Sequence, residues 1–155
     1  MKTNQATRSR GFTLIELMLV MVLIGILAAF AYPRLNVSTF NERGFFDETI
    51  QAVRYAQKLA VASHCEVRVS LDAGGFALEQ PTNSAQCGGT ISGWSPVPNP
   101  SGGSNFADAP PSGVAVGSAT ITFTAAGTTD GATQTVTIGG HQLKVWQATG
   151  FTERL

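Results

Sequence analysis

The sequence predicts an α+β protein in which one long N-terminal helix packs on an antiparallel β-sheet head. Residues 12–32 form an apolar segment of 21 residues, in which Glu16 is the one charged residue. A helical apolar period returns over about residues 42–63, and the β-rich part, residues 65–155, then begins with a period of two and ends in Gly-punctuated β-type segments. A run of helix followed by a run of strands is typical of the α+β class.

The first two segments predict a membrane anchor. Residues 1–11 hold three basic residues and no acid. As a helix, residues 12–32 would extend about 32 Å, enough to cross a hydrocarbon core of about 30 Å. The positive-inside rule keeps residues 1–11 in the cytoplasm and places residues 33–155 outside. We therefore expect a single-pass membrane protein whose C-terminal domain is periplasmic or extracellular.

The long helix is predicted to be interrupted at Pro33 and to continue as an amphipathic helix over about residues 42–63. Proline lacks a backbone donor and kinks a helix, here near the membrane exit. Apolar positions then recur at helical spacing and predict a face that lies on a soluble core: Phe46, Ile50, Val53 and Ala60. The opposite face is polar and carries Glu48, Gln51, Arg54 and Lys58.

The remaining residues predict antiparallel strands. Apolar and polar residues alternate over residues 65–71, and turn residues at 72–75 lead into a second short strand, which predicts a hairpin. Residues 80–113 are rich in Pro, Gly, Ser and Asn and predict a long irregular loop. Three β-type segments follow, and a Gly-Gly pair at 139–140 predicts a tight hairpin turn between two of them.

The two cysteines, Cys65 and Cys87, are predicted to form a disulfide. An oxidising compartment outside the cytoplasm favours their pairing. Loop-entropy arithmetic gives such a bridge a stabilising effect of about 3 kcal/mol. The alternative is a pair of free, buried thiols.

Glu16 needs an explanation, because a charged side chain at the centre of a membrane helix is disfavoured by about 2.5 to 3.5 kcal/mol. One alternative is a secretory signal peptide, since the small-x-small pattern at residues 29–31 would let signal peptidase release a soluble domain that starts at Tyr32. Another is a plain anchor in which Glu16 is incidental. On the residues alone, both remain open beside a dedicated role for the acid.

The stretch GFTLIEL at residues 11–17, after a basic leader and before a long apolar run, resembles the processing motif of type IV pilins and pseudopilins. The resemblance implies that a prepilin peptidase removes residues 1–11 by cutting between Gly11 and Phe12 and then methylates the amine of Phe12. It also implies that Glu16 neutralises that amine, on its own chain or a neighbour's, because an unpaired buried cation is costly. Other pilins and an inner-membrane assembly platform are the implied partners.

Residues 48–71 are similar to the helix-to-strand passage of the minor pseudopilin H and FimT-like group, whose head has two antiparallel sheets. This similarity implies a minor subunit that primes or caps a type IV pilus or a type II secretion pseudopilus. A DNA-uptake minor pilin and a minor subunit of a mannose-sensitive haemagglutinin-type pilus are the alternatives. Against DNA binding, residues 81–155 hold just two bases, Lys144 and Arg154, whereas phosphate affinity needs several bases together.

The sequence predicts no catalytic residue, metal site or cofactor. The two histidines, His64 and His141, lack the short paired spacing of a zinc site, and a disulfide would consume both thiols. A hydrolase nucleophile in a G-x-S-x-G turn is also missing from the sequence. The predicted activity is therefore polymerisation rather than catalysis.

Overall fold

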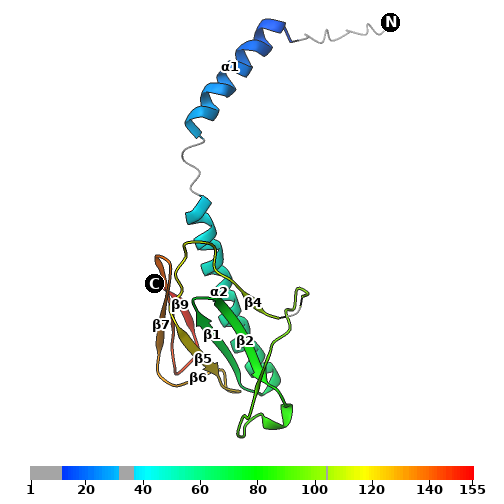
Figure 1. The fold of residues 1–155 in the computed structure, drawn as a ribbon, viewed down its shortest axis with the longest axis vertical. Helices are drawn as coiled ribbons and strands as arrows, with labels where there is room; N and C mark the ends of the chain where they lie inside the picture. Colours follow the sequence, from blue (N-terminus) through cyan, green and yellow to red (C-terminus); the bar gives the residue numbers. More distant parts are fainter. Residues whose placement is uncertain (1–11, 32–36, 104) are drawn as a thin grey trace, which may run out of the picture. The chain divides into compact units, whose positions relative to one another are not determined.

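The computed structural model describes residues 12–31, 37–103 and 105–155. The chain divides into two units, Met1–Val37 and Ser38–Leu155. Helix α1 (Leu14–Ala31) belongs to the first unit. Helix α2 (Val37–Ser63) and all the strands make up the second, which we call the head (Figure 1). An N-terminal helix packed on antiparallel sheets confirms the predicted α+β class.

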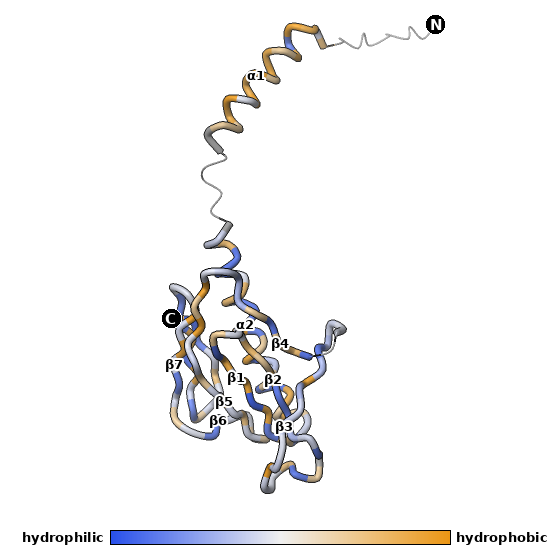
Figure 2. Tube along the Cα trace, viewed as in Figure 1, coloured by the Kyte–Doolittle hydropathy of each residue, from blue (hydrophilic) through white to orange (hydrophobic). Residues whose placement is uncertain are grey.

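Helix α1 is apolar on all sides. Each of its Leu, Ile, Val and Met side chains is at least 42% exposed, and the tube in Figure 2 is orange along most of this helix. Among the residues that the structure describes, none of the helices is both long and apolar enough to cross a membrane. The expected anchor extends to Tyr32 and the expected kink lies at Pro33, and both residues are outside the described ranges.

Helix α2 begins at Val37, five residues before the predicted start at 42. Its first turns are polar, so no apolar period marks them in the sequence. Gly44 disfavours a helix by about 1 kcal/mol relative to alanine. The next two residues, Phe45 and Phe46, are 4% and 1% exposed, and burial stabilises such side chains by about 1.5 to 3 kcal/mol each. Packing on the sheets therefore outweighs the local cost of the glycine.

The larger sheet has the strand order β3-β2-β1-β5-β6, and β4 pairs with β2 outside this path. Its strands are β1 (Val67–Asp72), β2 (Gly75–Pro81), β3 (Trp94–Pro96), β4 (Ala107–Asp108), β5 (Ala119–Phe123) and β6 (Thr129–Asp130). The predicted first hairpin is confirmed, because β1 and β2 pair antiparallel across the turn from Asp72 to Gly75. Asp72 stabilises that turn by accepting a hydrogen bond from the Gly74 amide at 2.6 Å.

The second sheet has the order β7-β8-β9, with β7 (Gln134–Ile138), β8 (His141–Val145) and β9 (Thr152–Arg154). The predicted Gly-Gly hairpin is also confirmed, since Ile138 pairs with His141 across Gly139 and Gly140. Gly139 has a φ of 57°, which side-chain-bearing residues rarely adopt. Two antiparallel sheets thus form the head, as the resemblance implied.

The prediction of a wholly irregular loop over residues 80–113 is wrong. Strands β3 and β4 lie in this range, and a 3-10 turn (Ser84–Gln86) precedes them. Both strands pair with the same edge of β2, β3 along Glu79–Pro81 and β4 along Phe76 and Ala77. Strands of three and two residues are too short to show an alternation of apolar and polar residues in the sequence. Their extended conformation depends on pairing with the edge of β2.

The core lies between α2 and the two sheets. Along α2, Ala52, Ala56 and Ala60 recur every four residues and are fully buried, so the helix backbone approaches the strands closely. The strands contribute larger side chains that are at most 2% exposed: Val67, Val69, Leu71, Ile121, Phe123, Val136, Leu143 and Val145. Helix α2 is therefore a fixed part of the head, and its opposite face is free to carry surface chemistry.

Candidate processing and assembly site

The N-terminus of α1 is capped by Thr13. The Glu16 amide donates to Thr13 Oγ1 at 3.3 Å and to the Thr13 carbonyl at 3.1 Å, and the Leu17 amide donates to the same carbonyl at 3.2 Å. A Thr followed three residues later by Glu is the spacing of a capping box. Thr13 was not among the predicted site residues, although its spacing from Glu16 is visible in the sequence.

Glu16 is an acid in the first turn of α1, a position where the helix dipole favours negative charge. Phe12, which precedes the helix, is 79% exposed. Gly11, the residue expected before the cleavage point, lies outside the described residues. Phe12, the expected new N-terminal residue, and Glu16 are therefore four residues apart, and both lie at the N-terminal end of α1.

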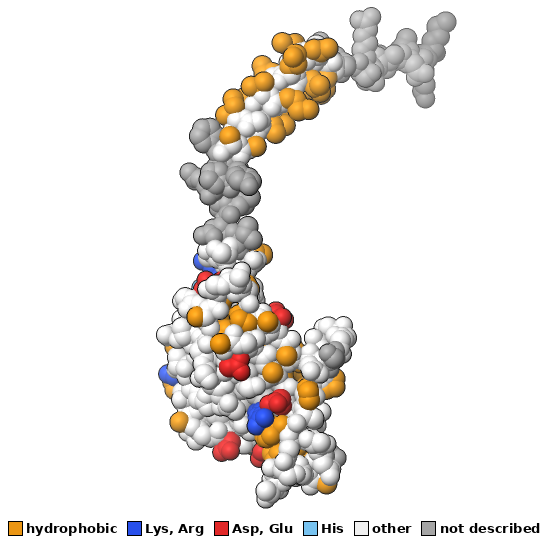
Figure 3. Space-filling model, viewed as in Figure 1, with side chains coloured by type: hydrophobic (Ala, Val, Ile, Leu, Met, Phe, Trp, Pro, Cys, Tyr) orange, Lys and Arg blue, Asp and Glu red, His pale blue; other side chains and the backbone are white. Residues whose placement is uncertain are grey.

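Within residues 12–31, the part of its unit that the structure describes, the Leu, Ile, Val and Met side chains of α1 are exposed. In Figure 3 its side chains are mostly orange over the visible face, whereas the head is mainly white with scattered charges. An exposed apolar surface of this kind marks a site that binds a membrane or another protein. Within the described residues, Glu16 is the one charged group on this helix.

The structure joins Cys65 and Cys87 by a disulfide with a Cα–Cα distance of 4.6 Å. The bridge fastens the segment after β2 to the junction between α2 and β1. Cys65 is buried, and His64 immediately before it has a φ of 55°. The two cysteines therefore fix the position of a turn and are not available as metal ligands.

Side chains of α2 also connect the helix to both sheets. The Gln57 Nε2 donates to the carbonyls of Gly127 and Thr149, at 2.8 Å each. Glu42 Oε1 accepts from the Gly140 amide at 2.6 Å. These contacts connect α2 to turns of both sheets at two points along the helix, Glu42 and Gln57.

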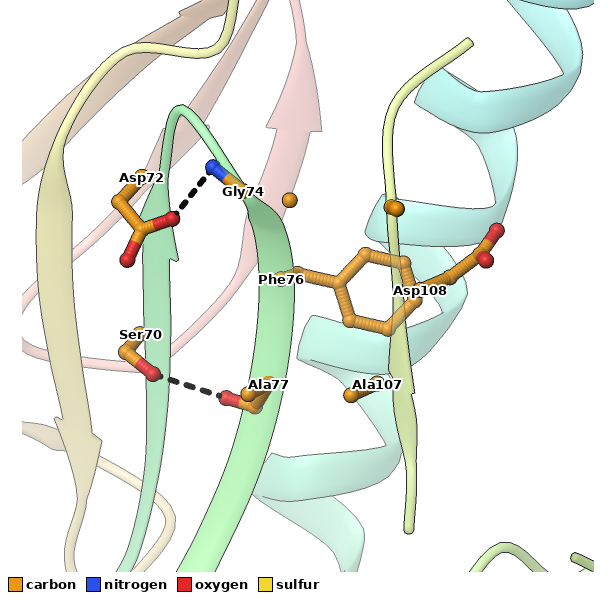
Figure 4. A pocket seen from close by; sticks show the side chains of 9 residues that line it. Ser70, Asp72, Gly74, Phe76, Ala77, Ala107 and Asp108 are labelled. Atoms are coloured by element: carbon orange, nitrogen blue, oxygen red, sulfur yellow. Dashed lines mark hydrogen bonds between the residues drawn. The ribbon is translucent and has the colours of Figure 1, made fainter.

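A shallow cavity of about 360 Å³ lies between the β1–β2 hairpin and β4. Figure 4 shows that the carboxylates of Asp72 and Asp108 point in different directions, Asp72 to its own turn and Asp108 towards α2. Asp72 is already engaged by the Gly74 amide. These two acids therefore do not form a common binding site.

Asp108 instead forms a pair with Glu48 on α2. Burial, together with the charge and a hydrogen bond of Asp108, raises the pKa of the Glu48 carboxyl above its ordinary value. Neither acid has a cation partner among the described residues. The sequence placed Glu48 on the polar face of the helix, but the meeting with Asp108 depends on β4 and was not predictable.

Two bases lie further along the same face. Arg54 and Lys58, with Gln51 and Tyr55, line a hollow of about 220 Å³ whose other wall is Pro100 and Phe106. The rings of Tyr55 and Phe106 meet edge to face at 5.1 Å between centroids. Arg54 donates to the Thr152 carbonyl at 3.2 Å, and no carboxylate within the described residues pairs with either base.

The histidines lie apart from these groups. His64 is exposed at the end of α2, whereas the His141 ring stacks on Phe46 at 5.0 Å. Among the residues that the structure describes, no group of three His, Cys, Asp or Glu side chains is placed to hold a metal ion.

Comparison with known proteins identifies the family. Residues 6–32 match the prokaryotic N-terminal methylation motif, and residues 47–149, more than half of the chain, match the family described as type II transport protein GspH. The chain belongs to this GspH-like family of type IV pilins and pseudopilins. Its members are structural subunits, so the chain is a pilin or pseudopilin subunit and not an enzyme.

A curated relative supports the same assignment. The chain is 46% identical over 54 residues to the type IV narrow pilus major component PilA5 of Thermus thermophilus. The match covers 34% of this chain and 47% of the relative, so the chain spans about half the length of the protein that it matches. No solved structure matches the chain significantly.

Proposed function

We propose that this pilin-family chain is a minor subunit that primes or caps a type IV pilus or a type II secretion pseudopilus. The observation that carries the proposal is the surface of α1, which is apolar on all sides apart from Glu16 near its N-terminus. A helix of this kind is stable when lipid or other helices cover it. The match of the head to the GspH family supports a place among the minor subunits.

In this proposal a prepilin peptidase removes residues 1–11 and methylates the amine of Phe12. Residues 12–32 first anchor the subunit in the inner membrane, with residues 33–155 in the periplasm, and an assembly platform then moves it into the filament. Cleavage creates a positive charge among apolar helices. Glu16, one turn along the chain, compensates that charge because removing an unpaired ion from water costs several kcal/mol.

A major subunit is the second candidate, supported by the name of the Thermus relative, a major pilus component. The two candidates differ in abundance. Quantitative mass spectrometry of sheared filaments distinguishes them, because a minor subunit is expected to be much less abundant than the main pilin. DNA uptake and a mannose-sensitive haemagglutinin-type pilus remain proposals for the subtype.

The test of the assembly role replaces Glu16 and follows the protein into sheared filaments. We expect Glu16→Gln, which keeps the size but loses the charge, to be cleaved normally and to be missing from filaments. Thr13→Ala is the matched control, because it removes the helix cap and keeps the acid. Normal incorporation of Glu16→Gln, or an equal loss in Thr13→Ala, would show that charge compensation is not the role of Glu16.

A further inference from the structure

The outer face of the β7–β8–β9 sheet combines aromatic and polar side chains. Strand alternation and the pairing register turn these side chains of the sheet and its β8–β9 turn away from the core: Thr135, Thr137, Gln142, Lys144, Trp146, Phe151, Glu153 and Leu155. Trp146 and Phe151, which flank that turn, are 41% and 57% exposed. Together with Ala148 and Thr149 they line a shallow hollow of about 560 Å³. An aromatic surface with a few polar groups beside it is a common feature of ligand sites.

The Trp146 ring is held in one orientation by its neighbours. Its Nε1 donates to Glu153 Oε2 at 3.0 Å. The Lys144 Nζ lies 3.8 Å from the ring centroid, in a cation–π contact. A ring that is already fixed loses little conformational entropy when a ligand stacks on it. The exposed ring is therefore preorganised for a ligand with a flat face.

The charges of this face favour a neutral ligand. Among its described side chains, the one base, Lys144, and the one acid, Glu153, are cross-strand neighbours, so their charges cancel. A nucleic acid binds through several bases, and the carboxylate would repel its phosphates. A lipid or another wholly apolar ligand would cover the polar groups without replacing their hydrogen bonds to water, which is unfavourable. A sugar ring satisfies both parts of the face, because its C–H face is apolar and its edge carries hydroxyl groups.

The hollow beside Trp146 favours a sugar that carries an N-acetyl group. Thr149 Oγ1 accepts from the Phe151 amide at 3.2 Å, and the Thr149 carbonyl accepts from the side chain of Gln57. The oxygens of Thr149 are thus already engaged, and the walls of the hollow are mainly two aromatic rings and the Ala148 methyl group. The methyl group of an acetamide gains from burial against such walls.

We propose that this face binds a glycan chain of N-acetylated hexosamines, with Trp146 and Phe151 against the sugar rings and Lys144 and Glu153 at the hydroxyl groups. At about 3.4 Å per residue, the face extends about 14 Å along β8 from Gln142 to Trp146, which is longer than one sugar ring. The inference goes beyond the proposed function and takes one premise from it, that the head lies in the periplasm. In that compartment, chains of this chemistry are the glycan strands of the cell wall, and these are the assigned ligand. Binding connects the subunit to the wall through which a filament extends.

Co-sedimentation of the full chain in detergent with purified peptidoglycan sacculi tests the site. We expect the wild type to sediment with the sacculi and to be released by a soluble oligomer of N-acetylglucosamine. The matching oligomer of glucose, which lacks the acetamide, should not release it. Trp146→Ala and Phe151→Ala should each weaken binding about tenfold, because each removes one stacked ring. Phe40→Ala is the matched control: Phe40 is 76% exposed but lies on α2, so its removal should leave binding unchanged.

A second measurement does not depend on the folding of the alanine variants. Trp94→Phe leaves Trp146 as the one tryptophan of the chain, and its fluorescence should change as the N-acetylglucosamine oligomer is added. No change would overturn the proposal. So would wild-type protein that fails to sediment, equal release by the glucose oligomer, or Trp146→Ala that sediments like the wild type.

Two further results would assign the face to a different ligand and overturn the proposal. One is binding that depends on Trp146 to vesicles of phosphatidylethanolamine and phosphatidylglycerol, or to single-stranded DNA. The other is loss of Trp146→Ala from sheared filaments, which would make the face a contact between subunits. Because co-sedimentation uses the purified chain, its failure overturns this site alone, whereas the proposed function is tested separately by Glu16→Gln in filaments.

Discussion

Removal of the disulfide should lower the stability of the head by an amount that the structure sets. Cys65 and Cys87 are 22 residues apart, and chain-entropy arithmetic for that loop gives about 3 kcal/mol. For a chain of this size, 1 kcal/mol shifts the unfolding temperature by about 2–4 °C. We therefore expect Cys65→Ala with Cys87→Ala to unfold about 6–12 °C below the wild type.

The assay is thermal unfolding of the full chain in detergent, followed by tryptophan fluorescence. Both tryptophans, Trp94 and Trp146, lie in the head, so the signal reports its unfolding. Reduced wild-type protein is the matched control because it keeps both side chains and loses the bond alone. Reductant should lower the unfolding temperature of the wild type and leave the variant unchanged. A shift below about 2 °C, or an equal effect of reductant on the variant, would refute the calculation.

Two further predictions concern α2. The pKa of the Glu48 carboxyl is raised above its ordinary value of 4.5 in the folded state, so its protonated form stabilises the fold. This contribution to the free energy of unfolding is lost as the pH rises from 4.5 through the folded-state pKa. Glu48→Gln should therefore unfold at a higher temperature than the wild type at pH 7 and at nearly the same temperature near pH 4; the opposite pH trend would contradict the pairing with Asp108. Gln57→Ala removes two hydrogen bonds at 2.8 Å, each contributing about 0.5–1.5 kcal/mol, so it should destabilise the head by about 1–3 kcal/mol in urea unfolding. A change within error would mean that α2 does not hold the two sheets together through this amide.

Elements with their own local signal were predictable from the sequence. The alternation at residues 65–71 predicted β1, and Gly139 with Gly140 predicted the β7–β8 turn, because both patterns follow from backbone geometry. Strands β3 and β4 were not predictable, because they exist through pairing with one edge of β2.

The candidate site divides in the same way. Glu16 stands out in an apolar run, and Arg54 and Lys58 follow the polar period of α2. Their relation to Asp108 and Phe106 depends on where β4 lies, and no local pattern records it. Single residues of this surface can thus be predicted from their spacing, whereas the way they come together depends on the fold.

The mature N-terminus tests the account most directly. Intact-mass and N-terminal peptide spectrometry of the protein from cells should show a chain that begins at Phe12, with one methyl group on its amine. A chain that begins at Tyr32 would indicate signal peptidase, and one that begins at Met1 would indicate an uncleaved anchor. Either result would contradict the claim that Glu16 compensates a charge created by cleavage.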